Sequence, residues 1–211
     1  MIQDIITYFV NNGQTYLTYV GQHLSLSIEA LVLACVLALP MAYFSYEKPW
    51  VKQVSTLLTQ GLRVIPSLGI LFILIPFIGV GRLPALIALV ILGIPPILLQ
   101  TIIGFESVSD TLVETALGLG MTKWQLLTKF ALPLALPRLL GGIKLALVEL
   151  IASTTLATYI GAGGLGTLIF TGLGLYRYDL LLIGGGSVAL LSFVSMVVFD
   201  LAIKGVTHDE T

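Results

Sequence analysis

Three charged residues, Glu29, Arg63 and Glu149, stand inside long apolar runs of the sequence. A charge held at the centre of a membrane costs roughly 3 kcal/mol or more unless it is paired or reaches water, so such residues are candidates for function. They could line the route of a solute. In the structural interpretation, Glu149 pairs with Arg63 or Lys144, and Arg63 extends its charge to the membrane surface. Both interpretations stay open at this point.

Small polar residues in the same runs are the second group of candidates for a solute route. They are Ser67, Ser153, Thr154, Thr155 and Tyr159. Hydroxyl groups in membrane helices also bond to their own helix or tie helices together, which is the alternative for each of them. Three consecutive residues of a helix cannot share one face, so we expect one of residues 153–155 to face a cavity.

A long polar break lies between residues 104 and 142, and its local signals predict two short helices joined at a glycine elbow. Capping-box spacings begin the helices, glycines end the first, and prolines are expected to stop the second. The spacings are Ser107-x-x-Asp110, Thr111-x-x-Glu114 and Thr122-x-x-Gln125, the glycines are Gly118 and Gly120, and the prolines are Pro133 and Pro137. On these signals alone, the segment could be a docking element or a hairpin that merely covers the rest of the chain.

The composition requires a membrane to surround these elements. Hydrophobic residues make up 57% of the 211 residues and charged residues only 10%, whereas soluble domains carry about 25% charge. The net charge of −1 gives no indication of nucleic-acid binding. The single Cys35 has no partner for a disulfide or a metal site, so redox and metal chemistry have no support.

Five stretches are long and apolar enough to cross a bilayer, which needs about 20 residues. They are residues 24–44, 57–78, 83–103, 143–160 and 180–203. We therefore expect an all-α membrane protein with an interfacial amphipathic segment at 1–23, one transmembrane domain at 24–203 and a tail at 204–211. Kinks are expected at the prolines within the second and third spans. The glycine-rich stretch 161–166 is expected to serve as a bending gate or as a helix-packing site.

The distribution of positive residues predicts the orientation. With the N-terminus outside, seven basic residues fall on the inner side and two, Arg82 and Arg177, on the outer side. The seven are Lys48, Lys52, Lys123, Lys129, Arg138, Lys144 and Lys204. We therefore expect the C-terminus and the loop 104–142 in the cytoplasm.

The polar loop also carries a signature that resembles a known family. Glu114-x-Ala116, Gly120 and, after nine residues, Phe130-x-Leu132-Pro133 resemble the EAA motif of binding-protein-dependent ABC importer permeases, EAA-x₃-G-x₉-I-x-LP. Thr115 and Phe130 depart mildly from it. The resemblance implies a MetI-like permease fold whose loop docks into an ATPase subunit, through Glu114, Ala116, Gly118, Gly120, Leu132 and Pro133. Glu114 is expected to anchor the loop by hydrogen bonds or an ion pair.

Further segments are similar to the glycine betaine, carnitine and choline branch of that family. They include residues 63–68, around Arg63-Val-Ile-Pro, and residues 160–166, around Gly161-Ala-Gly-Gly. The segment 98–104 departs from the branch pattern, with Gln100 where asparagine is usual and without its arginine. The resemblance implies inward transport of osmoprotectants. The alternatives are a permease for another small solute, such as an amino acid or methionine, and a secondary transporter that works without ATP.

The resemblance also implies the partners and the cofactors. We expect a dimer of ABC ATPase subunits that binds ATP and Mg²⁺, a second permease subunit of the same or a related kind, and an extracytoplasmic substrate-binding protein. This chain has no GxxxxGK[ST] phosphate loop, and we expect no catalytic residue, cofactor or metal in it. The expected location is the bacterial cytoplasmic membrane, with the lipid bilayer as surroundings and no nucleic acid as a partner.

Overall fold

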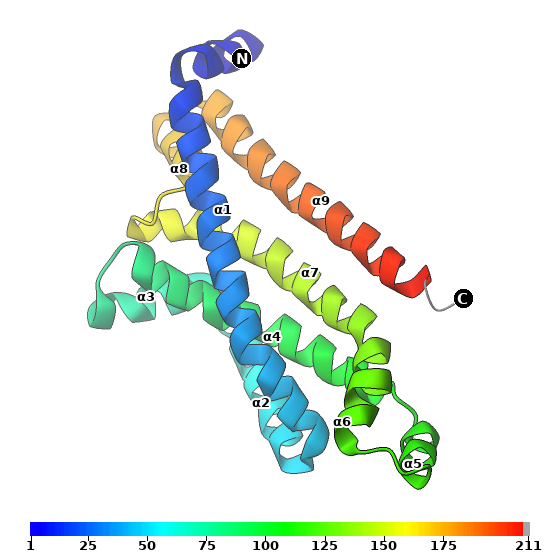
Figure 1. Cartoon of the computed structure of the whole chain (residues 1–211). Helices are drawn as coiled ribbons and strands as arrows, with labels where there is room; N and C mark the ends of the chain where they lie inside the picture. Colours follow the sequence, from blue (N-terminus) through cyan, green and yellow to red (C-terminus); the bar gives the residue numbers. More distant parts are fainter. Residues whose placement is uncertain (209–211) are drawn as a thin grey trace.

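The computed structural model describes residues 1–208, and within that range the chain is helical and contains no strand (Figure 1). The elements in chain order are α1 (Ile2–Glu47), α2 (Pro49–Val64), α3 (Ser67–Ile78), α4 (Arg82–Glu106), α5 (Asp110–Gly118), α6 (Lys123–Leu126), the π-helical turn η1 (Leu127–Ala131), α7 (Leu132–Ala157), the 3₁₀ turn η2 (Thr158–Ile160), α8 (Gly166–Leu175) and α9 (Tyr178–His208). Residues 209–211 of the expected cytoplasmic tail lie outside the described residues.

The first predicted span belongs to a longer helix, because α1 extends from Ile2 to Glu47. Its helical geometry is interrupted at Asn12, and the turns before that residue lie across the end of the helix (Figure 1). A stripe of buried alanines at four-residue spacing follows one side of α1: Ala30, Ala34, Ala38 and Ala42. Residues four apart share a helix face, so these small side chains let α1 pack closely on the helices behind it.

The second predicted span is sharply bent, and the expectation of a kinked but continuous helix is wrong. Helices α2 and α3 meet at 93° across a break at Ile65 and Pro66. Proline restricts the residue before it to extended backbone, and Ile65 has φ −78° and ψ 121°. By contrast, Pro95 and Pro96 remain inside α4, where both are buried among neighbouring helices. Neighbouring helices can compensate for the backbone hydrogen bonds that a proline removes.

Helices α4 and α7 form the most extensive helix contact of the chain. Glycines let their backbones approach. A Cβ on Gly142 would lie 2.8 Å from Gln100 Cβ and 3.0 Å from the Pro96 carbonyl oxygen, and one on Gly104 would lie 2.9 Å from the Ala135 carbonyl oxygen. In lipid, helices associate largely through van der Waals packing, and small residues at the contact allow the close approach that this packing needs. This pair is therefore the rigid centre of the molecule.

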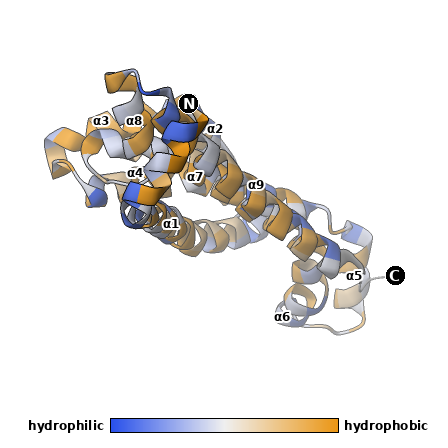
Figure 2. Cartoon of the chain, turned by 90° about the horizontal axis from the view of Figure 1, so that it is seen from above, coloured by the Kyte–Doolittle hydropathy of each residue, from blue (hydrophilic) through white to orange (hydrophobic). Residues whose placement is uncertain are grey.

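Helix α9 lies at the edge and exposes most of its apolar side chains. In Figure 2, the long helices are coloured as hydrophobic along most of their lengths, as expected for lipid contact. Polar contacts fix α9 at both ends. Tyr16 Oη and Ser187 Oγ lie 2.8 Å apart, and Lys144 Nζ donates to Asp200 Oδ1 at 2.6 Å.

Four single helices are long and apolar enough to be spans, and the bent α2–α3 pair lies where the second span was predicted. The expectation of an all-α membrane fold is confirmed, with four single spans, or five if the bent pair counts as one span. The predicted tight connection between the second and third spans is also present. It contains Gly79 and Gly81, both with positive φ, and Gly81 N–H donates to the Ile160 carbonyl oxygen.

The glycine-rich stretch at residues 161–166 packs against α1. Gly164 N–H donates to Gln22 Oε1 at 3.0 Å, and a Cβ on Gly164 would lie 3.2 Å from His23 Nδ1. His23 is fully buried, and its Nε2 donates to the Ile151 carbonyl oxygen at 2.9 Å. The stretch is therefore part of the contact between α1 and the end of α7, which favours the packing role over a free gate.

Candidate functional site

Helix α5 carries Glu114 and begins at a cap that the sequence pattern did not indicate. Ser109 Oγ accepts a hydrogen bond from Leu112 N–H at 3.3 Å. The capping boxes expected at Ser107 and Thr111 do not begin this helix. Ser107 Oγ donates to the Gly104 carbonyl oxygen instead, and Thr111 already lies inside the helix. The N-cap that is present leaves Asp110 in the first turn, where a negative charge is favoured by the helix dipole.

Gly120 ends α5 in the way predicted. It has φ +85°, and two backbone hydrogen bonds close the turn: Met121 N–H donates to the Ala116 carbonyl oxygen at 3.1 Å, and Gly120 N–H donates to the Leu117 carbonyl oxygen at 3.0 Å. This pair of bonds is the Schellman motif, in which the residue after the helix adopts left-handed backbone. Gly118, by contrast, is the last helical residue and needs no special conformation.

The second half of the hairpin begins at a complete capping box. Thr122 Oγ1 accepts from Gln125 N–H at 3.2 Å, and Gln125 Oε1 accepts from Thr122 N–H at 2.9 Å, as predicted. The expectation that Pro133 and Pro137 stop this helix is wrong. A π-helical turn, in which Leu132 N–H donates to the Leu127 carbonyl oxygen, leads directly into α7. Pro133 lies in the turn that follows this π-helical turn, and Pro137 lies inside α7, so neither proline ends the helix.

The hairpin α5–α6 is anchored to the bundle on one side. Leu112, Val113 and Leu127 pack against a cluster that contains Phe105 and Ala135. Lys52 of α2 forms an ion pair with Glu106 at the end of α4, just before the hairpin. These contacts hold the hairpin as an extension of the central helices.

Its other side is exposed. Leu119 is 81% exposed and Trp124 is 70% exposed. Glu114 is also exposed, and among the described residues it forms no ion pair within 4 Å. The anchoring role expected for Glu114 therefore has no partner inside the described part of the chain. Ala116 is buried beneath the hairpin, while Leu132 is partly exposed at its end. Large exposed apolar side chains next to an exposed carboxylate are typical of a surface that binds another protein.

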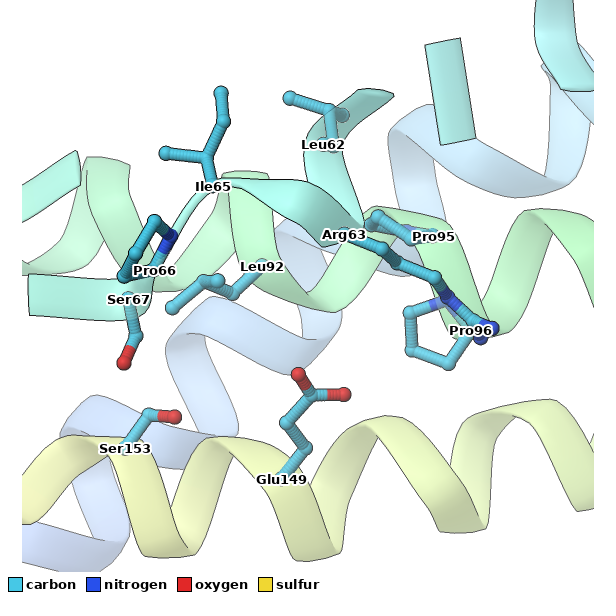
Figure 3. Close-up of a pocket in the computed structure, with 10 residues that line it drawn as sticks. All are labelled: Leu62, Arg63, Ile65, Pro66, Ser67, Leu92, Pro95, Pro96, Glu149 and Ser153. Carbon is cyan, nitrogen blue, oxygen red and sulfur yellow. The ribbon is translucent and has the colours of Figure 1, made fainter. Parts of the chain in front are cut away.

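A pocket of about 240 Å³ lies beside the bend between α2 and α3 (Figure 3). It brings together four of the predicted residues: Arg63, Ser67, Glu149 and Ser153. Glu149 and Ser153 are four residues apart on α7, so they share the face that points toward α2 and α3. The remaining walls are apolar or backbone: Leu62, Ile65, Pro66, Leu92, Pro95 and Pro96. No local sequence signal indicated these walls, because the bend is what brings them together.

The other charges of the spans form separate pairs. Arg82 donates to Glu29 Oε1 at 2.8 Å, and Lys144 pairs with Asp200 rather than with Glu149. Among the described residues, no ion pair within 4 Å involves Arg63 or Glu149. The structure therefore does not show the expected pairing of Glu149, although the two charges line the same pocket.

The remaining polar candidates lie elsewhere. Thr154 is fully buried, donates to the Leu150 carbonyl oxygen at 2.7 Å and lies 2.9 Å from Ser27 Oγ of α1. Thr155 donates to its own helix, at the Ala152 carbonyl oxygen. Tyr159 is exposed and packs edge-on against Phe170, with ring centroids 4.4 Å apart. Of the three consecutive hydroxyl residues, Ser153 is the one that lines the pocket.

The all-helical membrane fold and the hairpin that carries the EAA-like motif agree with a membrane permease of the ABC importer class, and comparison with known proteins shows the family. The family model described as "Binding-protein-dependent transport system inner membrane component" matches residues 30–208. The chain belongs to this family, and the family expected from the hairpin motif is confirmed. It is therefore an inner-membrane transport component.

Individual relatives cover most of the chain. It is 44% identical over 190 residues to the carnitine transport permease protein OpuCB of Listeria monocytogenes, covering 90% of this chain and 87% of the relative. It is 34% identical over 206 residues to the glycine betaine/carnitine/choline transport system permease protein OpuCB of Bacillus subtilis, covering 98% and 95%. The osmoprotectant import permease protein OsmY of Salmonella typhimurium is 35% identical over 185 residues, covering 86% and 78%.

Solved structures share the fold. An inward-facing structure of the MetNI methionine ABC transporter matches with a TM-score of 0.81 at 22% identity, over 90% of this chain and 95% of that chain. An amino acid ABC transporter crystallised with histidines matches with a TM-score of 0.74 at 18% identity, over 94% and 95%. The MetI-like architecture expected from the sequence is thereby confirmed.

Proposed function

We propose that this chain is the transmembrane permease subunit of an importer for quaternary ammonium osmoprotectants, such as glycine betaine, carnitine and choline. The observation that carries the proposal is the 44% identity to a carnitine transport permease over 90% of this chain. The relatives at 34% and 35% identity are also permeases named for osmoprotectants.

The hairpin α5–α6 is the proposed coupling element. It presents Leu119 and Trp124 to a partner while its caps and its anchoring cluster keep it from deforming. Because η1 and α7 continue directly from α6, a force applied to the hairpin is transmitted to the helix that carries Glu149. A rigid lever of this kind can convert the movement of an ATPase subunit into movement at the pocket.

The partner composition follows from this role. This chain supplies the membrane path, a dimer of ATPase subunits supplies ATP hydrolysis with Mg²⁺, and an extracytoplasmic binding protein delivers the solute. A second permease subunit would cover the face of α7 that carries Glu149, which is exposed in the single chain. Glu114 would find its partner on the ATPase side of the hairpin.

The orientation can be tested by labelling two exposed positions at opposite ends of the molecule (Figure 1). Tyr176 is 83% exposed at the end of α8, and Leu119 is 81% exposed at the hairpin. In a Cys35→Ser background, a membrane-impermeant thiol reagent should label Tyr176→Cys in intact cells and Leu119→Cys only after permeabilisation. The reverse pattern would overturn the proposed orientation.

The transport function is tested by uptake in proteoliposomes that contain the full complex: this permease, its ATPase and its binding protein. Radiolabelled glycine betaine, carnitine or choline should accumulate only when ATP is enclosed on the ATPase side. Accumulation of methionine or another amino acid in place of these solutes would favour the alternative substrate class. Uptake by the permease without the ATPase would favour a secondary transporter.

A further inference from the structure

The pocket beside the α2–α3 bend carries opposite charges on facing walls. Arg63 extends from the end of α2 toward α4, and the Glu149 carboxylate rises from α7 into the same space (Figure 3). Ser67 lies on one wall with its hydroxyl pointing toward α7, and Ser153 lies on the opposite wall, on α7. We propose that this pocket is a transit site for zwitterionic solutes, in which Arg63 faces a carboxylate and Glu149 faces a quaternary ammonium group. The proposal rests on the proposed function and narrows its substrate class.

Arg63 and Glu149 do not form an ion pair with each other, and this supports a pocket in which a solute can lie between them. Near the spans, Glu29, Asp200 and Glu106 each lie within 4 Å of a basic side chain, at Arg82, Lys144 and Lys52 respectively. Arg63 and Glu149 do not close to that distance anywhere in the described chain, although they line one pocket of about 240 Å³. A purely structural pair would close, because an unpaired charge within a span is costly.

The positions of Arg63 and Glu149 also indicate which face of the chain is turned away from lipid. Arg63 and Glu149 are exposed in the single chain, and Glu149 lies within the apolar helix α7. Charged residues at such positions face a water-filled cavity or the interior of a bundle rather than lipid. This face is therefore not a lipid-facing surface. It is turned toward the interior of the assembly, where the second permease subunit of the proposed complex would enclose the pocket.

The uncharged walls determine how a quaternary ammonium group could be held. Aromatic cages bind such groups by cation–π attraction, but none of the ten residues that line this pocket in the described chain is aromatic. Here the attraction must come from the Glu149 carboxylate, while Leu92, Pro95 and Pro96 offer apolar surface to the methyl groups. Arg63, with its planar donors, is the group suited to a carboxylate.

This arrangement has a consequence for selectivity. Glycine betaine and carnitine carry both charges, whereas choline carries only the cation. Arg63 should therefore matter for the first two solutes more than for choline, and Glu149 should matter for all three. A merely structural role for Arg63 predicts the same loss for every solute.

The test compares uptake of radiolabelled glycine betaine and choline by the complete complex in proteoliposomes. Both rates are normalised to the amount of permease in the membrane and to wild type with the same binding protein, so the preference of the binding protein cancels. Arg63→Gln should lower the betaine-to-choline ratio by about tenfold or more, the size expected for loss of one charge-assisted contact. Glu149→Gln should lower both rates by a similar factor.

Two further variants make the result decisive. Arg63→Lys keeps the positive charge but loses the planar donors, so its betaine uptake should lie between that of wild type and that of Arg63→Gln. This comparison uses betaine alone and so applies even if the complex does not transport choline. Arg82→Gln removes a cation outside the pocket and should leave the ratio unchanged. An equal loss of both solutes in Arg63→Gln, or a betaine rate that does not depend on Arg63, would overturn the transit site. Failure of the wild-type complex to move either solute would instead refute the proposed function.

Discussion

The centre of the α4–α7 contact and the tip of the α5–α6 hairpin both depend on glycine, but for different physical reasons. Gly142 is required by lack of space, since a Cβ there would meet Gln100 and Pro96 at 3.0 Å or less. Gly120 has open space around it and is required by its backbone, at φ +85°. The first glycine allows two helices to touch, and the second shapes a turn.

The two glycines therefore let the stability of the bundle and the function of the hairpin be tested separately. The α4–α7 contact lies in the buried centre of the molecule, so damage there should reduce the amount of folded protein. The hairpin tip is exposed and attached on one side only, so a change there should leave the bundle intact. Substitutions at two pairs of nearby glycines test this separation. Gly142 is crowded and Gly141 is not, while Gly120 has a positive φ and Gly118 is helical.

The largest effect is expected at Gly142. Replacing it with Ala places a methyl group 2.8 Å from Gln100 Cβ and 3.0 Å from the Pro96 carbonyl oxygen, and overpacking of this kind costs about 1–3 kcal/mol. The control is Gly141→Ala, where nothing lies within 4 Å and helix propensity should stabilise by up to about 1 kcal/mol. Thermal unfolding in detergent should therefore move in opposite directions for the two variants. Equal melting temperatures would contradict the close approach of α4 and α7.

The next effect is expected at Gly120 and should appear in coupling. An L-residue pays about 1–2 kcal/mol for left-handed backbone, so Gly120→Val should distort the turn and leave the amount of permease in the membrane unchanged. ATP hydrolysis by the complex should continue while uptake falls several-fold. Gly118→Val is the matched control, because Gly118 is helical and has nothing within 4 Å. Gly120→Asn should retain more uptake, since Asn tolerates left-handed backbone. Normal uptake by Gly120→Val would remove the hairpin from the coupling role.

Local signals in the sequence predicted the turn and the second cap of the hairpin, because these interactions are local, but the first helix begins at Ser109 and not at Ser107 or Thr111. The capping box at Thr122 and the glycine turn at Gly120 involve residues at most five positions apart. The prolines misled the prediction for a related reason. A proline ends a helix when the backbone cannot adjust to its ring and its missing N–H. Here the backbone adjusts through the π-helical turn that precedes Pro133. A single sequence shows the proline but does not show the turn that absorbs it.

The pocket could be predicted only in part. The charges of Arg63 and Glu149 in apolar runs marked them as candidates, since burial of charge is costly wherever the helices lie. Which charges meet depends on the tertiary fold: the 93° bend brings Arg63 beside α4 and α7, while Lys144 finds Asp200 on α9. The same holds for Thr154, whose contact with Ser27 joins helices distant in the sequence.

The smallest effect is expected at the hairpin's second cap. Thr122→Ala removes the hydroxyl that accepts from Gln125 N–H, and loss of such a cap costs about 1 kcal/mol. Because the cap lies in the exposed hairpin, the cost should appear as faster amide hydrogen exchange at residues 123–126 rather than as a lower melting temperature of the bundle. Thr115→Ala serves as the control, since the Thr115 hydroxyl only donates back to the Thr111 carbonyl oxygen within α5. If exchange slowed or stayed the same in Thr122→Ala, the stiffness of the hairpin would have to come from its packing on Leu127 and its neighbours alone.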